Sequence, residues 1–230
     1  MSNKDGRDYL YLIWKSEKER KQFIVGVLSR NGQYEFKYYD DIKDAKNEGF
    51  KPLVEFPDLN KLYTSESLFS TFASRLPDKR RRDMSKILKK YELKEFNQYE
   101  LLKKSGARLP IDNYEFINPV FDYDVPFGRT FYLAGARYYL CCDGSDCSKS
   151  VNIDVDEELY LKKELENKHD PYAVAVYNKT QSLIGYVPRY YSEGLFELLQ
   201  KNEKEIHCYV KLVNKNNNCS ECLKLYLEVE

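Results

Sequence analysis

The sequence has few of the residues on which common enzyme chemistry depends. Its 230 residues include two histidines and one tryptophan, and no apolar run of about 18 residues that could span a membrane. It has no Gly-x-x-x-x-Gly-Lys loop for nucleotide phosphates and no Gly-x-Ser-x-Gly nucleophile motif. Its acidic residues are scattered among basic neighbours, so no pair of catalytic carboxylates can be named. These absences argue against an enzyme, and we expect no cofactor.

The first residues also lack the apolar region of a secretory signal, so we expect a cytoplasmic protein that does not enter a membrane. In that reducing compartment the six cysteines should be thiols or metal ligands rather than disulfides. Two spaced pairs could hold zinc as a weak alternative to free thiols in two loops: Cys142 with Cys147, and Cys219 with Cys222.

Aromatic and aliphatic residues are plentiful. The chain is 42% hydrophobic, with 21 tyrosines and 12 phenylalanines, which is enough to bury a core and excludes general disorder. Its zero net charge hides a split: residues 1–118 carry 24 Lys and Arg against 19 Asp and Glu, and the remainder carries 13 against 18. Neither half has the basic excess of a tight, non-specific nucleic-acid binder.

The N-terminal half begins with strand patterns. Apolar runs at 9–14 and 23–29 predict two strands, and Asn31-Gly32 predicts a hairpin to a third strand at 34–38. Helical spacing follows in residues 68–76. The first half therefore predicts an antiparallel sheet with helices.

Two more helices are predicted in this half. One should begin near Pro77 and place Met84 and Tyr91 on a single face. Asn97 to Glu100 resembles a capping box for the other, which Gly106 would end. The basic run Lys79 to Arg82 would then lie at a helix start, either as a solvated face or as a surface for an acidic partner or a phosphate backbone.

Two prolines and a glycine within residues 118–128 mark a domain boundary. Beyond it, apolar runs predict short strands beginning with 131–140, one helix near Leu195 to Leu199, and two final strands at 206–213 and 223–229. That content fits a small β-barrel. The fold class is thus α+β, with domains at 8–118 and 127–230.

The second domain resembles the HIRAN family. The carrying residues are Leu133-Ala134-Gly135-Ala136-Arg137-Tyr138-Tyr139, the segment from Leu161 to Val176 with its Asp-x-x-Ala-x-x-Val pattern, and Ile184-Gly185-Tyr186-Val187-Pro188-Arg189. The resemblance implies an OB-like barrel of the kind that is fused to DNA remodellers and grips the 3′ end of single-stranded DNA.

Site residues follow from this resemblance position by position. Arg137 and Tyr138 would hold a phosphate and a base, and Asp170 would meet the terminal hydroxyl, with Tyr186 and Arg189 beside it. His169 and Tyr186 depart from the remodeller version, which has a phenol before the aspartate and a histidine at the other position. The alternative is that Asp170 only builds a turn.

The first domain resembles the N-terminal subdomain of HipA-type toxin kinases. The resemblance is carried by the segment from Val25 to Tyr38 and by Leu68-Phe69-Ser70-Thr71-Phe72-Ala73-Ser74-Arg75-Leu76-Pro77. In that family the subdomain precedes a kinase core and packs over it. Split versions bind and restrain a separately encoded kinase. The kinase motifs themselves are missing here.

The two resemblances together imply a non-catalytic accessory or antitoxin subunit of a HipA-like Ser/Thr kinase, with a HIRAN module that binds DNA. The alternative is a protein that binds the 3′ end of single-stranded DNA. Partners would be the kinase, single-stranded DNA and a helix-turn-helix antitoxin. The candidate partner-binding residues are Phe69, Phe72, Arg80, Arg81 and Arg82. An apolar underside including Phe69 and Phe72 is expected to be exposed without the partner.

Overall fold

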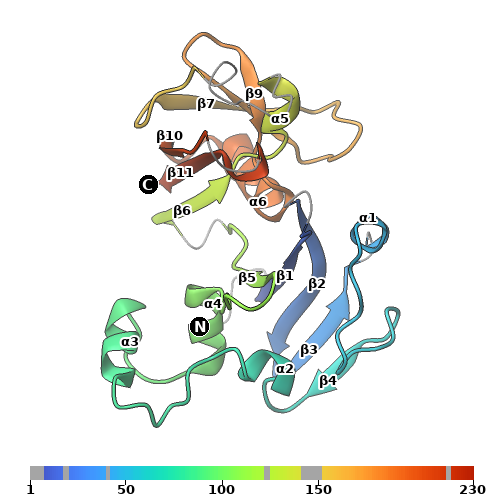
Figure 1. Ribbon diagram of the computed structural model, residues 1–230. Helices are drawn as coiled ribbons and strands as arrows, with labels where there is room; N and C mark the ends of the chain where they lie inside the picture. The colour runs from blue at the N-terminus through green and yellow to red at the C-terminus, as the bar shows by residue number, and fades with distance from the viewer. Residues whose placement is uncertain (1–7, 18–20, 40–41, 122–124, 141–151, 216–218) are drawn as a thin grey trace. The chain divides into compact units, whose positions relative to one another are not determined.

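The computed structural model describes residues 8–17, 21–39, 42–121, 125–140, 152–215 and 219–230 (Figure 1). The chain divides into two compact units, with the boundary between Pro119 and Val120. The class is α+β, as the sequence predicts. Each unit is described by itself.

The N-terminal unit contains a five-stranded antiparallel sheet in the order β4-β3-β2-β1-β5. Long-range pairing brings the last strand beside the first, with Leu12 opposite Phe116. The predicted hairpin is confirmed, because Asn31 pairs with Gln33 around Gly32, whose φ is 83°. The strands are β1 (Tyr9–Lys15), β2 (Gln22–Asn31), β3 (Gln33–Tyr38), β4 (Tyr63–Ser65) and β5 (Tyr114–Ile117).

In the part of this unit that the structure describes, the chain forms four helices: α1 (Lys43–Asn47), α2 (Ser70–Ala73), α3 (Met84–Lys90) and α4 (Gln98–Ser105). The capping prediction for α4 is confirmed, since the Asn97 side chain accepts hydrogen bonds from the N–H groups of Tyr99 and Glu100, and Gly106 ends the helix with φ 68°.

The expected helix start at Pro77 is wrong, because α3 begins at Met84. The Asp78 carboxylate accepts from the backbone N–H of Arg80 at 2.8 Å, a local turn that competes with helix formation. The basic run therefore lies in the turn before α3 rather than in its first turn.

Aromatic rings fill the core on which α2 packs. Phe72 is 1% exposed and lies 5.2 Å from the ring of Phe36 and 5.0 Å from that of Phe116, centroid to centroid. Phe69 is 7% exposed and stands edge-on to Phe56 at 5.0 Å. The expectation that Phe69 and Phe72 form an exposed underside is therefore wrong: they are part of this unit's own core.

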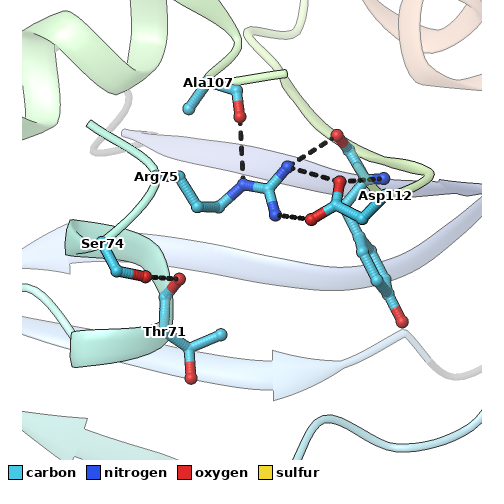
Figure 2. A network of polar contacts seen from close by, with 6 residues as sticks. Thr71, Ser74, Arg75, Ala107 and Asp112 are labelled. Atoms are coloured by element: carbon cyan, nitrogen blue, oxygen red, sulfur yellow. Dashed lines mark hydrogen bonds and ion pairs between the residues drawn. The ribbon is translucent and has the colours of Figure 1, made fainter. Parts of the chain in front are cut away.

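Arg75, just after α2, joins this helix to the segment before β5 (Figure 2). Its side chain is 8% exposed, and its guanidinium donates to both carboxylate oxygens of Asp112 at 2.5 and 3.0 Å. It also donates to the backbone carbonyls of Ala107 at 3.0 Å and Tyr114 at 2.9 Å. These contacts hold together two segments more than 30 residues apart in the sequence.

The C-terminal unit contains a curled antiparallel sheet of six strands in the order β6-β11-β10-β7-β8-β9. Its first strand pairs with its last, with Phe127 opposite Val229. The strands are β6 (Phe127–Tyr132), β7 (Glu158–Lys163), β8 (Val174–Tyr177), β9 (Leu183–Tyr186), β10 (Ile206–Val213) and β11 (Leu223–Val229).

The sheet curls so far that its two edge strands are joined. Ala134, two residues beyond β6, exchanges two backbone hydrogen bonds of 2.9 Å with Tyr186 at the end of β9. Gly185 permits this approach: its φ is 153°, and a Cβ there would lie 2.5 Å from the Ala134 carbonyl oxygen. The result is a curled half-barrel, where the sequence predicts a small β-barrel.

The described residues of this unit also form two helices and a short 3-10 turn: α5 (Ala136–Tyr139), α6 (Arg189–Lys201) and η2 (Cys219–Glu221). The expectation that residues 136–139 continue a strand is wrong, because Gly135 adopts φ 75° and starts α5 instead. The apolar face of α6 packs on the curled sheet, and Leu195 is fully buried.

Candidate functional site

Three segments of the C-terminal unit meet where the sheet closes. They are α5, the connection between β7 and β8 at residues 164–173, and the junction of β9 with α6 at residues 186–192. We call them the closing rim. All six candidate DNA-binding residues lie on it: Arg137, Tyr138, His169, Asp170, Tyr186 and Arg189.

Asp170 fixes the turn against α6. One carboxylate oxygen accepts from the Ser192 hydroxyl and the other from the backbone N–H of Tyr172, each at 2.9 Å. Ser192 is only 2% exposed, whereas Asp170 is half-buried. A carboxylate has about four acceptor positions, so Asp170 can still take a hydrogen bond from a bound hydroxyl. The turn-building role and a binding role are therefore compatible.

Arg189 reaches back across the rim. Its guanidinium donates to the backbone carbonyl of His169, and both side chains are exposed. This contact uses one of the five N–H donors of the guanidinium. The structure thus brings Arg189, His169 and Asp170 together, as the resemblance implies.

Glu164 and Asn167 organise the same turn. The Asn167 amide donates to the Glu164 carboxylate at 2.7 Å, and its carbonyl oxygen accepts from the backbone N–H groups of His169 and Asp170. Hydrogen bonds from Asn167 and from the Tyr186 hydroxyl lower the pKa of Glu164. Burial and the hydrogen bond to Glu164 raise the pKa of Tyr186, which keeps it a neutral phenol.

Arg137 and Tyr138 lie on the short helix α5. Both are exposed, and 74% of Tyr138 is accessible to solvent. The next residue, Tyr139, connects α5 to β9, because its ring stands edge-on to that of Tyr186 at 5.5 Å. The rim therefore presents a guanidinium, an exposed aromatic ring and a carboxylate, the groups that bind phosphate, base and hydroxyl.

Sequence reasoning gave no role to Glu164, Asn167, Ser192 or Tyr139. The first two lie inside the segment that carries the HIRAN resemblance, in the spacing Glu164-x-x-Asn167, which is suited to an amide–carboxylate contact across a turn. The hydrogen bond from Ser192 to Asp170 joins residues 22 positions apart, and no local sequence pattern predicts it.

In the N-terminal unit the basic candidates are exposed. Arg80 pairs with Asp78 at 2.8 Å and Arg81 with Asp83 at 2.9 Å, both two residues apart. Arg82 is also exposed, and it forms no ion pair with any residue in the part of the chain that the structure describes. These three residues are available to a partner, unlike Phe69 and Phe72.

The zinc alternative concerns residues that the structure covers only in part. Cys142 and Cys147 lie outside the described residues. Cys222 is 1% exposed, and its thiol lies 3.2 Å from the Cys219 carbonyl oxygen. Among the described residues, no three His, Cys, Asp or Glu side chains gather closely enough to hold a metal ion.

The fold and the rim define an α+β chain of two domains, the second of which is a curled half-barrel. Comparison with protein families identifies both. Residues 20–110 match the HipA N-terminal domain, and residues 129–230 match the HIRAN domain. The chain therefore contains a HipA N-terminal domain followed by a HIRAN domain, which confirms both resemblances, and the match includes no kinase domain.

Solved structures similar to this chain include two of the same human domain. The crystal structure of the HIRAN domain of human HLTF is 19% identical over 44% of this chain and 74% of that one, with a TM-score of 0.35. The NMR structure of the HLTF HIRAN domain in its DNA-bound conformation is 17% identical over 44% and 73%, with a TM-score of 0.33.

A crystal structure of a protein from Lactobacillus plantarum is 17% identical over 45% of this chain and 99% of that one, with a TM-score of 0.33. No curated protein matches the chain. Within the described residues, no helix has both the length and the apolar character needed to cross a membrane.

Proposed function

We propose that this chain is a non-catalytic accessory or antitoxin subunit that binds and restrains a separately encoded HipA-like Ser/Thr kinase. The observation that carries the proposal is the order of the domains. A HipA N-terminal domain at residues 20–110 is followed by a HIRAN domain at residues 129–230, at the position where HipA-type kinases continue into their kinase core.

The packing of the N-terminal unit supports this role. Its aromatic core is closed by its own residues, with Phe36, Phe56 and Phe72 each at most 1% exposed. A domain that packs by itself can present its surface to a kinase encoded on another chain. Arg80 to Arg82 form the exposed basic part of that surface.

Co-expression with a HipA-like kinase core tests the proposal. We expect the two chains to purify as a stable complex and the growth arrest caused by the kinase to be relieved. A fragment of residues 127–230 should neither bind the kinase nor relieve the arrest. Relief by that HIRAN fragment alone would show that the roles of the two domains are assigned wrongly.

The closing rim favours a second function, binding of the 3′ end of single-stranded DNA. Arg189, His169 and Asp170 are held together by hydrogen bonds, and exposed Arg137 and Tyr138 lie on the adjoining helix. A guanidinium–phosphate contact contributes about 1.5–3 kcal/mol, and a stacked base about 1–3 kcal/mol. Because residues 119–230 carry 18 acidic against 13 basic side chains, we expect binding only in the micromolar range.

The chemical group at the 3′ end of an oligonucleotide distinguishes this function from general affinity for DNA. Fluorescence anisotropy should show tighter binding of an oligonucleotide with a 3′-hydroxyl than of one with a 3′-phosphate, because the phosphate would place negative charge against Asp170. Asp170→Asn should reduce this preference, whereas Glu203→Gln, which removes an exposed charge from the same domain, should leave it unchanged. Equal binding of both ends by the wild type would contradict the proposal.

A further inference from the structure

The N-terminal unit contains a pocket of about 660 Å³ beside the basic turn. It lies between the end of α2, the turn that follows it, and the start of α4. We call it the basic-rimmed pocket. Its lining residues are Tyr34, Ala73, Leu76, Pro77, Asp78, Lys79, Arg80, Phe96, Asn97 and Gln98.

The floor of the pocket is apolar and aromatic. Leu76, Phe96 and Tyr34 are half-buried, so each still offers surface to a ligand. The Arg30 guanidinium lies 5.6 Å from the centre of the Tyr34 ring and 5.7 Å from that of Tyr99. Tyr99 is fully buried, so this stacking joins the Tyr34 side of the pocket to the core.

The rim at the basic turn is positively charged. Residues 78–83 carry one lysine and three arginines against two aspartates, and the side chains of Lys79 and Arg80 are exposed at the pocket. Two short contacts, Arg80 with Asp78 and Arg81 with Asp83, hold the turn in shape. Of the two cations at the pocket, Arg80 is therefore already positioned, which lowers its share of the entropy cost of binding.

We propose that the basic-rimmed pocket binds an acidic peptide segment of a partner protein, which inserts one apolar side chain onto the Leu76–Phe96 floor and places carboxylates against Lys79 and Arg80. The proposal extends the partner role given above and rests on it for the identity of the partner. The pocket volume falls in the range of about 300–1,000 Å³ that is usual for ligand sites.

The distribution of charged residues around the pocket favours a peptide over a nucleic acid as the ligand. A nucleic-acid backbone needs cations along a track, since each nucleotide adds a phosphate. Here the lining cations, Lys79 and Arg80, are confined to one turn, where Asp78 pairs with Arg80 and leaves a net charge of +1. The other lining residues are apolar, phenolic or amide in character. A peptide that carries a carboxylate next to a large apolar side chain matches this distribution.

A phage-displayed library of random 12-residue peptides, selected on the full-length chain, tests the proposal without a known partner. We expect enriched peptides that combine Asp or Glu with a large apolar residue. Their affinity should fall at least tenfold for Lys79→Glu/Arg80→Glu. The control Lys51→Glu/Lys86→Glu makes the same charge change at exposed lysines outside the pocket and should bind normally.

Several results would overturn the proposal: no enrichment, peptides without acidic residues, or equal affinity for both double variants. Displacement of the peptides by single-stranded DNA from the wild type would assign the pocket to nucleic acid instead. The selection does not involve the kinase. Peptide binding with no kinase complex would refute the partner role alone, and a kinase complex that tolerates Lys79→Glu/Arg80→Glu would refute the pocket alone.

Discussion

Among single residues, Arg75 stands out because its guanidinium donates four hydrogen bonds. It satisfies one carboxylate and two backbone carbonyls that come from residues 107–114, and it is itself almost completely buried. An arginine suits this position because its planar fork donates in several directions at once, which a lysine ammonium cannot reproduce with the same geometry.

Replacing this residue should destabilise the N-terminal unit. Arg75→Ala would remove the guanidinium donor from Asp112 and from two backbone carbonyls, and we expect a loss of about 2–4 kcal/mol in the free energy of unfolding. Trp14, the only tryptophan and 8% exposed, reports on this unit in urea denaturation followed by fluorescence. Arg80→Ala removes an exposed pair and should leave the transition unchanged; a similar loss there would argue against the role of Arg75.

Asp112 makes this stability depend on pH. Burial alone would raise its pKa, but the hydrogen bonds from Arg75 and from the Tyr114 N–H outweigh burial and lower it below the ordinary value of 3.8. A lowered folded-state pKa gives stability that is present above the ordinary pKa and lost as the pH falls through the folded-state value.

We therefore expect the wild type to be more stable than Asp112→Asn at pH 6, and the difference to shrink on acidification toward pH 3, as the carboxylate becomes protonated. Urea midpoints from Trp14 fluorescence at the two pH values measure this. A difference that stays constant or grows on acidification would show that the charge of Asp112 does not stabilise the fold.

For the helices and strands, the sequence signals that predicted the structure correctly were local ones. Asn97 and Gly106 lie at the two ends of α4, and Gly32 lies within the hairpin turn, so each element carries its own start or stop. The signals that failed depend on distant residues or on local competition. Nothing near Ala134 indicates that it pairs with Tyr186, and the Asp78 side chain delays α3 although the apolar spacing fits a helix from Pro77.

The candidate DNA-binding site shows the same limit. His169, Asp170 and Arg189 could be named because a family motif contains them, and the structure places them together. Ser192 belongs to the site only because α6 lies against the turn, which is a tertiary contact. The burial of Phe69 and Phe72 could not be read from their spacing, since an apolar helix face packs equally well on its own core or on a partner.

The closure of the half-barrel can be tested at Gly185. Gly185→Ala would place a Cβ 2.5 Å from a backbone oxygen at a positive φ, and we expect a loss of about 2–4 kcal/mol with faster hydrogen exchange at Ala134 and Tyr186. Gly128→Ala is the control, because the atoms nearest to its Cβ belong to the side chain of Tyr226, which can move, and not to the backbone. Equal effects of the two substitutions would show that closure does not depend on Gly185.

At the scale of the whole molecule, two compact units carry opposite charge, net +5 through residue 118 and net −5 after it. They match the HipA N-terminal domain and the HIRAN domain, and the match includes no kinase domain. We therefore expect the purified chain neither to bind ATP–magnesium in calorimetry nor to phosphorylate itself. Micromolar binding of ATP by this chain alone would contradict the non-catalytic assignment.

The strand pairings also set an order for synthesis on the ribosome. In the N-terminal unit the last strand to pair, β5, ends at Ile117, so this unit has all of its strands while the rest of the chain is still being translated. In the C-terminal unit β6 pairs with β11, so its sheet can be completed only after residues 223–229 have left the ribosome. A nascent chain should thus carry a finished HipA-like domain ahead of an incomplete HIRAN domain, and a partner kinase could be captured before translation ends.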